Sequence, residues 1–155
     1  MKQIILLSGI LLSFSAYSKD IALEKAQKIA EEALNHCTSL GYMVAVTVVD
    51  TAGNTKVVMR ADGAGPHTID ASRRKAYTSA SAKNKTSDML LVSQTNPLAR
   101  NLGEIDGFLL LGGGVPVTDN GEMVGAIGVG GAPSGTIDET CAQAGIDSDF
   151  RKPRK

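Results

Sequence analysis

Glycine is concentrated in one part of this 155-residue chain: 11 of its 17 glycines lie between Gly103 and Gly135. Glycine loses more backbone freedom on folding than any other residue, so this density has an entropic cost. Glycine is favoured where the chain makes a tight turn, where two backbones approach closely, or where the surface is left open for a ligand. The stretch therefore predicts turns and thin strands that another backbone or a ligand approaches closely.

Runs of β-branched and apolar residues, bounded by turn residues, predict the strands. The run 42–50 is mostly apolar and β-branched, which predicts a central strand buried on both faces. Asp119-Asn120-Gly121 predicts a hairpin, because Asn and Gly accept the positive φ angles of tight turns. Five strands are predicted in all, at 42–50, 55–61, 107–111, 114–119 and 121–130.

Helical segments alternate with these strands. In the first of them Ala26, Ile29 and Ala33 share one face at helical spacing, and Asp20 is placed to cap the helix. Hairpin-linked strands with helices between them predict an α+β fold, a two-layer sandwich around an antiparallel sheet in the order α-ββ-αα-βββ-α. The helices are predicted at 20–40, 68–84, 86–94 and 137–145.

Residues 1–18 have the three parts of a secretory signal peptide. Lys2 gives the positive start, an apolar run follows, and Ala16 and Ser18 are the small residues before a cleavage point. The apolar run is shorter than the ~20 residues of a transmembrane helix, and an N-terminal membrane anchor is the alternative. We therefore expect a periplasmic or secreted protein with no stable membrane insertion after cleavage.

The remainder is predicted to be one domain over 19–150, followed by a basic tail at 151–155. The 16 basic and 16 acidic residues balance, which gives no electrostatic attraction for nucleic acid or a membrane surface. Cys37 and Cys141 are the two cysteines. An oxidising compartment permits a disulfide between them, and the alternative is two buried free thiols.

Two segments carry a family resemblance. One is GGGVPVTDNGEMVGAIGVGGA, followed by an acidic helix start, and the other is the upstream RADGAGPHTIDASRRKAYTSAS, a glycine-containing loop that leads into a helix. Over roughly Ala22 to Gly145 the chain resembles the GlcG/HbpS-like family, small haem-binding or haem-degrading domains also found as the C-terminal domain of some cobalamin adenosyltransferases. The resemblance implies a profilin-like fold with a five-stranded antiparallel sheet, helices mainly on one face, and a homo-oligomer.

His67 is the main candidate for chemistry. A haem site needs an axial ligand, apolar walls and cations for the propionates. His67 lies at a loop-to-helix junction, a place from which a side chain can project into a cleft. Given the resemblance, it is a candidate ligand of haem iron, a proton carrier or a hydrogen-bond donor, and the alternative is a turn residue. Arg60 ends a strand beside this loop and is the best-placed cation for an anionic ligand.

The backbone of two glycine segments is predicted to complete this pocket. A nucleotide is improbable there, because no Gly-Lys-Ser/Thr follows GVGGAPSGT and the dinucleotide glycine spacing is absent. The predicted pocket-lining glycines are Gly112, Gly113, Gly114, Gly130 and Gly131.

The other charged candidates receive simpler interpretations. Arg73 and Lys75 are predicted to lie on a solvated helix face, where Asp62 and Asp70 would pair with them. His36 is predicted to be a partly exposed residue at the end of the first helix.

Taken with the family resemblance, these residues predict an exported haem- or tetrapyrrole-binding protein, with a role in haem uptake, storage or breakdown. An enzyme or binding protein for a small carboxylate metabolite, with His67 as proton carrier, is the second hypothesis. The scarcity of aromatic residues, three Phe and three Tyr with no Trp, favours this second hypothesis somewhat. A structural or assembly module without a ligand is the third.

Overall fold

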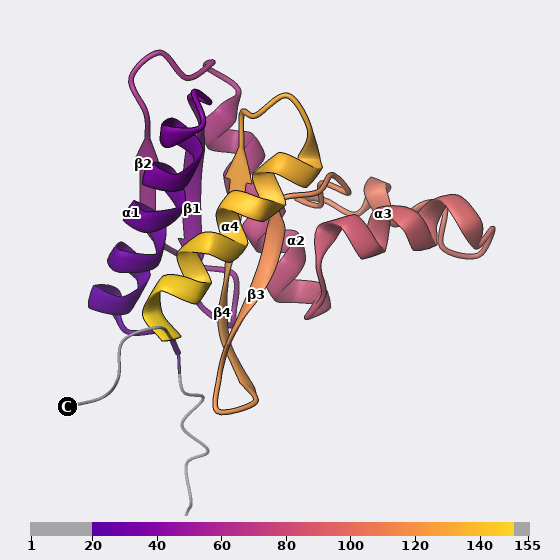
Figure 1. Ribbon diagram of the computed structural model, residues 1–155. Coiled ribbons are helices and arrows are strands. Elements are labelled where there is room, and N and C mark those ends of the chain that lie inside the picture. The colour runs from indigo at the N-terminus through magenta and orange to yellow at the C-terminus, as the bar shows by residue number, and fades with distance from the viewer. Residues whose placement is uncertain (1–19, 151–155) are drawn as a thin grey trace, which may run out of the picture.

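The structure is a computed structural model that describes residues 20–150, so the predicted signal peptide and basic tail lie outside the described residues. Figure 1 shows a sheet with helices packed around it and one helix that projects away. Within residues 20–150 no helix is both long and apolar enough to cross a membrane. The elements are α1 (Leu23–Ser39), β1 (Ala45–Val49), β2 (Thr55–Arg60), α2 (Thr68–Ala82), α3 (Thr86–Thr95), the 3₁₀ turn η1 (Leu102–Glu104), β3 (Gly114–Asp119), β4 (Glu122–Gly130) and α4 (Gly135–Phe150).

The four strands form one antiparallel sheet in the order β2-β1-β4-β3. All five residues of β1 are buried, as the sequence predicts for a central strand. The predicted hairpin between β3 and β4 is confirmed, and its turn places Asn120 at φ 51° and Gly121 at φ 84°. The α+β class and the antiparallel sheet are therefore confirmed.

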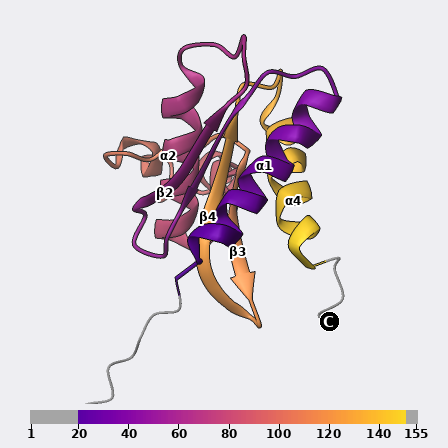
Figure 2. The same ribbon diagram turned by 90° about the vertical axis from the view of Figure 1, so that its left-hand side faces the viewer.

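Helices cover both faces of the sheet, so the prediction of a two-layer sandwich with helices mainly on one face is wrong. Val46 and Val48 belong to the main core with residues of α1 and α4. The alternate residue Thr47 points to the opposite face, where its Oγ1 lies 2.8 Å from Ser72 Oγ of α2. Figure 2 shows α2 on one side of the sheet and α1 with α4 on the other. Helices cover both faces because neither face of β1 carries charged side chains that would favour exposure to water.

The predicted strand at 107–111 is also wrong, because side chains satisfy the backbone of this segment in place of a neighbouring strand. Thr78 Oγ1 accepts the N–H of Leu109 at 2.8 Å, and the Arg74 guanidinium donates to the carbonyl of Phe108. Thr86 Oγ1 donates to the carbonyl of Leu111 at 2.8 Å. Because these backbone groups already have hydrogen-bond partners, the apolar run does not have to pair with a neighbouring strand.

Glycines on β4 allow α2 to lie unusually close to the sheet. A Cβ built on Gly128 would clash with the carbonyl oxygen of Ser72 and lie 2.5 Å from the backbone nitrogen of Ala76. Both of those residues are small and fully buried. The glycine density of the sequence is thus explained largely by backbone-to-backbone packing.

The disulfide favoured by the sequence is present and joins α1 to α4. It links Cys37 to Cys141, with a Cα–Cα separation of 5.5 Å and a sequence separation of 104. Both cysteines are fully buried. A cross-link over a loop of this length stabilises the fold by about 5 kcal/mol in the chain-entropy model.

We predict that Gly128→Ala lowers the free energy of unfolding by about 3 kcal/mol, because the methyl group forces α2 away from β4. Gly103→Ala is the matched control, since the nearest atom to its built Cβ is Leu110 Cδ1 at 3.8 Å; its change should stay within about 0.5 kcal/mol. Urea unfolding with the disulfide intact measures both. Equal stability of the two variants would contradict the packing described here.

Candidate functional site

The loop between β2 and α2 holds His67 at the surface. The Arg60 guanidinium donates to the carbonyl of Ala64, and Thr68 donates to the carbonyl of Gly65 through both its N–H (3.1 Å) and its Oγ1 (2.8 Å). His67 itself is exposed. Among residues 20–150 its imidazole makes no hydrogen bond. The loop is therefore fixed by its own contacts, and the exposed imidazole, which lies over Gly65, is not held by a hydrogen bond within the described residues.

The segment at the end of β4 lies beside this loop. A Cβ built on Gly131 would lie 3.0 Å from Thr68 Cγ2 and 2.9 Å from the carbonyl oxygen of Met43. One built on Gly130 would lie 3.2 Å from Ala71 Cβ, in the first turn of α2. Gly131 also has a φ of 131°, which L side chains rarely adopt. The structure thus brings the predicted residues Gly130 and Gly131 next to the start of α2, one residue from His67.

The predicted residues Gly112, Gly113 and Gly114 lie elsewhere. All three are buried. Protein atoms already fill the space around them: Gly112 faces the carbonyl oxygen of Gly135 at 2.9 Å, and Gly113 faces Lys75 Nζ at 3.1 Å, both measured from a built Cβ. These glycines lie inside the contact between α2, β4 and α4, and their predicted role in binding a ligand stays a prediction.

Lys75 lies inside this contact, and the prediction that it occupies a solvated helix face is wrong. Only 1% of it is exposed. Its Nζ lies 2.7 Å from Asp138 Oδ2 and donates to the carbonyl of Val129 at 3.0 Å. The prediction for Arg73 is confirmed, because its guanidinium pairs with Asp70 at 2.8 Å on the exposed face.

Sequence periodicity does not reveal Lys75, because the buried face of α2 carries no apolar stripe. That face consists of small or hydroxyl-bearing residues, so a lysine among them resembles any other polar position. The spacing of the small residues is the signal that places Lys75 on the same face. The buried residues of α2 are Thr68, Ser72, Lys75, Ala76, Thr78, Ser79 and Ala80.

Asp138 is the anion of the pair and also holds the loop after β4. Its side chain is 3% exposed. Its Oδ1 accepts the N–H of Ala132 at 3.0 Å, and the backbone N–H of Gly131 also donates to this carboxylate. Burial raises the pKa of Asp138 above its usual value, because the loss of hydration outweighs the attraction of Lys75 and the hydrogen bonds.

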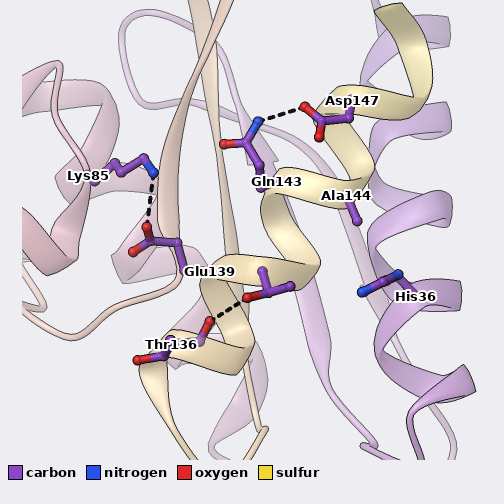
Figure 3. A pocket seen from close by; sticks show the side chains of 8 residues that line it. His36, Lys85, Thr136, Glu139, Gln143, Ala144 and Asp147 are labelled. Carbon is purple, nitrogen blue, oxygen red and sulfur yellow. Dashed lines mark hydrogen bonds and ion pairs between the residues drawn. The ribbon is translucent and has the colours of Figure 1, made fainter. Parts of the chain in front are cut away.

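A surface pocket of about 350 Å³ lies between α1, α4 and the start of α3. Figure 3 shows His36 of α1 facing the exposed side of α4 there. The charged groups of this pocket are paired, since Lys85 Nζ lies 3.0 Å from Glu139 Oε1 and Gln143 Nε2 donates to Asp147 at 2.9 Å. As predicted, His36 is a partly exposed residue in the last turn of its helix.

A second pocket of about 600 Å³ lies beside the β3–β4 hairpin and is lined by residues such as Lys83 and Glu122. Neither pocket includes His67. In the described part of the chain no group of three or more His, Cys, Asp or Glu residues is placed to hold a metal ion.

Comparison with known proteins assigns the family. The family described as "Haem degrading protein HbpS-like" matches residues 21–147. The chain belongs to the HbpS-like family. The resemblance stated from the two sequence segments is therefore confirmed.

Individual members are similar along most of their length. A double variant of Streptomyces reticuli HbpS has 40% sequence identity and a TM-score of 0.78, covering 96% of this chain and 97% of that one. An uncharacterized 15.0 kDa protein in the dhaT-dhaS intergenic region of Citrobacter freundii is 31% identical over 131 residues, 82% of this chain and 90% of that protein. PduOC, solved as a haem complex, has 22% identity and a TM-score of 0.74 over 83% of this chain and 94% of that one, and this likeness concerns the fold alone.

We predict that Lys75→Met destabilises the HbpS-like domain by about 3–5 kcal/mol near pH 7, because Asp138 remains buried without its cation. The native pKa of Asp138 then lies further above the unfolded value, so the native state binds a proton more readily than the unfolded state. Stability is therefore regained as the pH falls through the raised native pKa. Urea unfolding at pH 7.5 and pH 5 measures this recovery.

Arg73→Met is the control, because it removes the same charge from the exposed face of the same helix. It should change stability by about 1 kcal/mol or less at either pH. A loss for Lys75→Met that is equal at both pH values would show that Asp138 does not take up the proton.

Proposed function

We propose that this HbpS-like protein binds haem at the exposed surface around His67. The family is described as haem degrading, and the structurally similar PduOC was solved with haem. The observation that carries the proposal is the exposed imidazole of His67, which makes no hydrogen bond within residues 20–150 and lies in the loop that Arg60 and Thr68 hold. A role in haem uptake, storage or breakdown is consistent with this site.

The residues around His67 have the donor types that haem requires. The imidazole is a common axial ligand of haem iron, and Arg60 carries the positive charge that a propionate pairs with. Met43 and Ile69 expose apolar surface in the same region, at 41% and 43%. Bound haem supplies redox and oxygen chemistry at its iron, and the chain supplies a ligand, apolar contact and charge.

We predict that haemin titrated into the purified wild-type protein gives a saturable shift of the Soret band. His67→Ala should abolish the wild-type spectrum and weaken binding at least tenfold, because the axial nitrogen is lost. His36→Ala is the matched control, since it removes the other histidine, in the pocket on α4. A wild-type protein without a saturable shift refutes haem binding, and an unchanged His67→Ala spectrum removes this residue from the ligand role.

We further propose that the protein is exported, with residues 1–18 as its signal peptide. The pattern of that segment supports export. The disulfide between α1 and α4 supports it too, because structural disulfides persist in oxidising compartments such as the periplasm.

We also propose that the protein forms a homo-oligomer through the α3 arm, defined as residues 86–106. This arm projects from the body of the domain (Figure 1). Apolar side chains on it are exposed to an extent that is unusual for a monomer's surface. They are Leu91 at 60%, Val92 at 43%, Leu98 at 97% and Ile105 at 46%.

We predict that the double variant Leu91→Glu/Leu98→Glu dissociates the oligomer, because it places charge in a buried apolar interface. Val58→Glu is the control, since Val58 is also exposed, at 43%, but lies on strand β2. Sedimentation velocity measures the mass of each protein. An unchanged mass for the double variant, or a monomeric wild type, contradicts the proposed interface.

A further inference from the structure

The buried ion pair between Lys75 and Asp138 connects three elements. Lys75 lies on α2, Asp138 in the first turn of α4, and the carbonyl of Val129, which also accepts from Lys75, near the end of β4. Removing two charges from water costs so much that apolar residues of similar volume are commonly as stabilising as a buried ion pair. Stability alone therefore does not explain the pair, and its geometry suggests a second role.

Asp138 determines the path of the loop that follows β4. Its carboxylate accepts the backbone N–H groups of Gly131 and Ala132. Its own N–H donates to the carbonyl of Ser134 at 3.1 Å, so the loop closes over the start of α4. The carboxylate stays in this position because Lys75 Nζ, 2.7 Å from it, holds the opposite oxygen.

The other side of this loop rests on the start of α2. Gly131 packs against Thr68, at 3.0 Å from a built Cβ to Thr68 Cγ2, and Thr68 follows His67 directly. A continuous series of contacts therefore leads from Lys75 through Asp138 and Gly131 to the residue beside His67.

We infer that the Lys75–Asp138 pair is a positioning device, which holds Gly131 and Ala132 against α2 and thereby fixes the ligand-binding surface beside His67. This inference rests on the proposed haem site for its functional consequence. The positioning itself is a property of the chain, and it can be measured without haem.

The first measurement is native-state amide hydrogen exchange in the full chain without haem. In Lys75→Met the amides of Gly131 and Ala132 should exchange at least tenfold faster, beyond any change at Ala30, a buried reference residue of α1. A purely stabilising pair would instead accelerate all three amides alike through global unfolding. Arg73→Met should not accelerate Gly131 and Ala132 beyond any change at Ala30.

The second measurement is haemin affinity of the folded variants. Lys75→Met should weaken haemin binding about tenfold, and Arg73→Met should alter it less than twofold. Asp138→Asn is the second variant, because it removes the anion and decides the question if Lys75→Met does not fold; the same local loss of protection is expected.

The two proposals fail separately. Wild-type protection of Gly131 and Ala132 in the folded variants would overturn the positioning role, whatever haemin does. A wild-type protein that does not bind haemin would refute the proposed function, and the exchange result would still decide the positioning role.

Discussion

The close approach of α2 to strand β4 is the contact on which most of the structure depends. It requires glycine at position 128 on the strand and small residues on the helix, because backbone atoms of the two elements occupy the space of a side chain. Lys75 is buried within this contact, and a buried ammonium group needs an anion beside it. Asp138 of α4 supplies that anion. The close packing of α2 on β4 thus accounts for the position of α2 and for the burial of the Lys75–Asp138 pair.

The two faces of the sheet are stabilised by different means. The face toward α1 and α4 is an aliphatic core closed by the disulfide, and burial of apolar surface is its main source of stability. The face toward α2 has a smaller apolar cluster, and hydrogen bonds such as that between Thr47 and Ser72 lie beside it. The proposed site lies at one end of this second layer.

The sequence predicts well what local chemistry decides. The hairpin at Asn120 and the central strand β1 follow from turn residues and β-branched runs, and both are present. The run 107–111 has the composition of a strand, but the partners of its backbone are side chains of α2 and Thr86, which no local pattern reveals. Helices cover both faces of the sheet because β1 has no polar face. The periodicity of a short apolar run does not show which elements will cover its two faces.

Some residues of the candidate site can likewise be predicted from the sequence, and others cannot. His67 at a loop-to-helix junction is recognisable from sequence, and the structure brings Gly130 and Gly131 to the start of its helix. Gly112, Gly113 and Gly114 belong to a different contact, because glycine serves close packing as well as open surfaces. Lys75 is harder to recognise, since the spacing of the small residues Ser72, Ala76 and Ser79, and no apolar stripe, is what indicates the buried face of this helix.

One hydroxyl group connects the base of the α3 arm to the segment before β3. Thr86 Oγ1 donates to the carbonyl of Leu111 and accepts the N–H of Gly114, so it completes the hydrogen bonding of two main-chain groups at the base of the arm. If the arm rotated, at least one of these groups would lose its partner, at a cost of about 1–3 kcal/mol for a buried group. Thr86 thus ties the first residue of the arm to the segment that leads into β3, while the apolar side chains of the arm remain exposed.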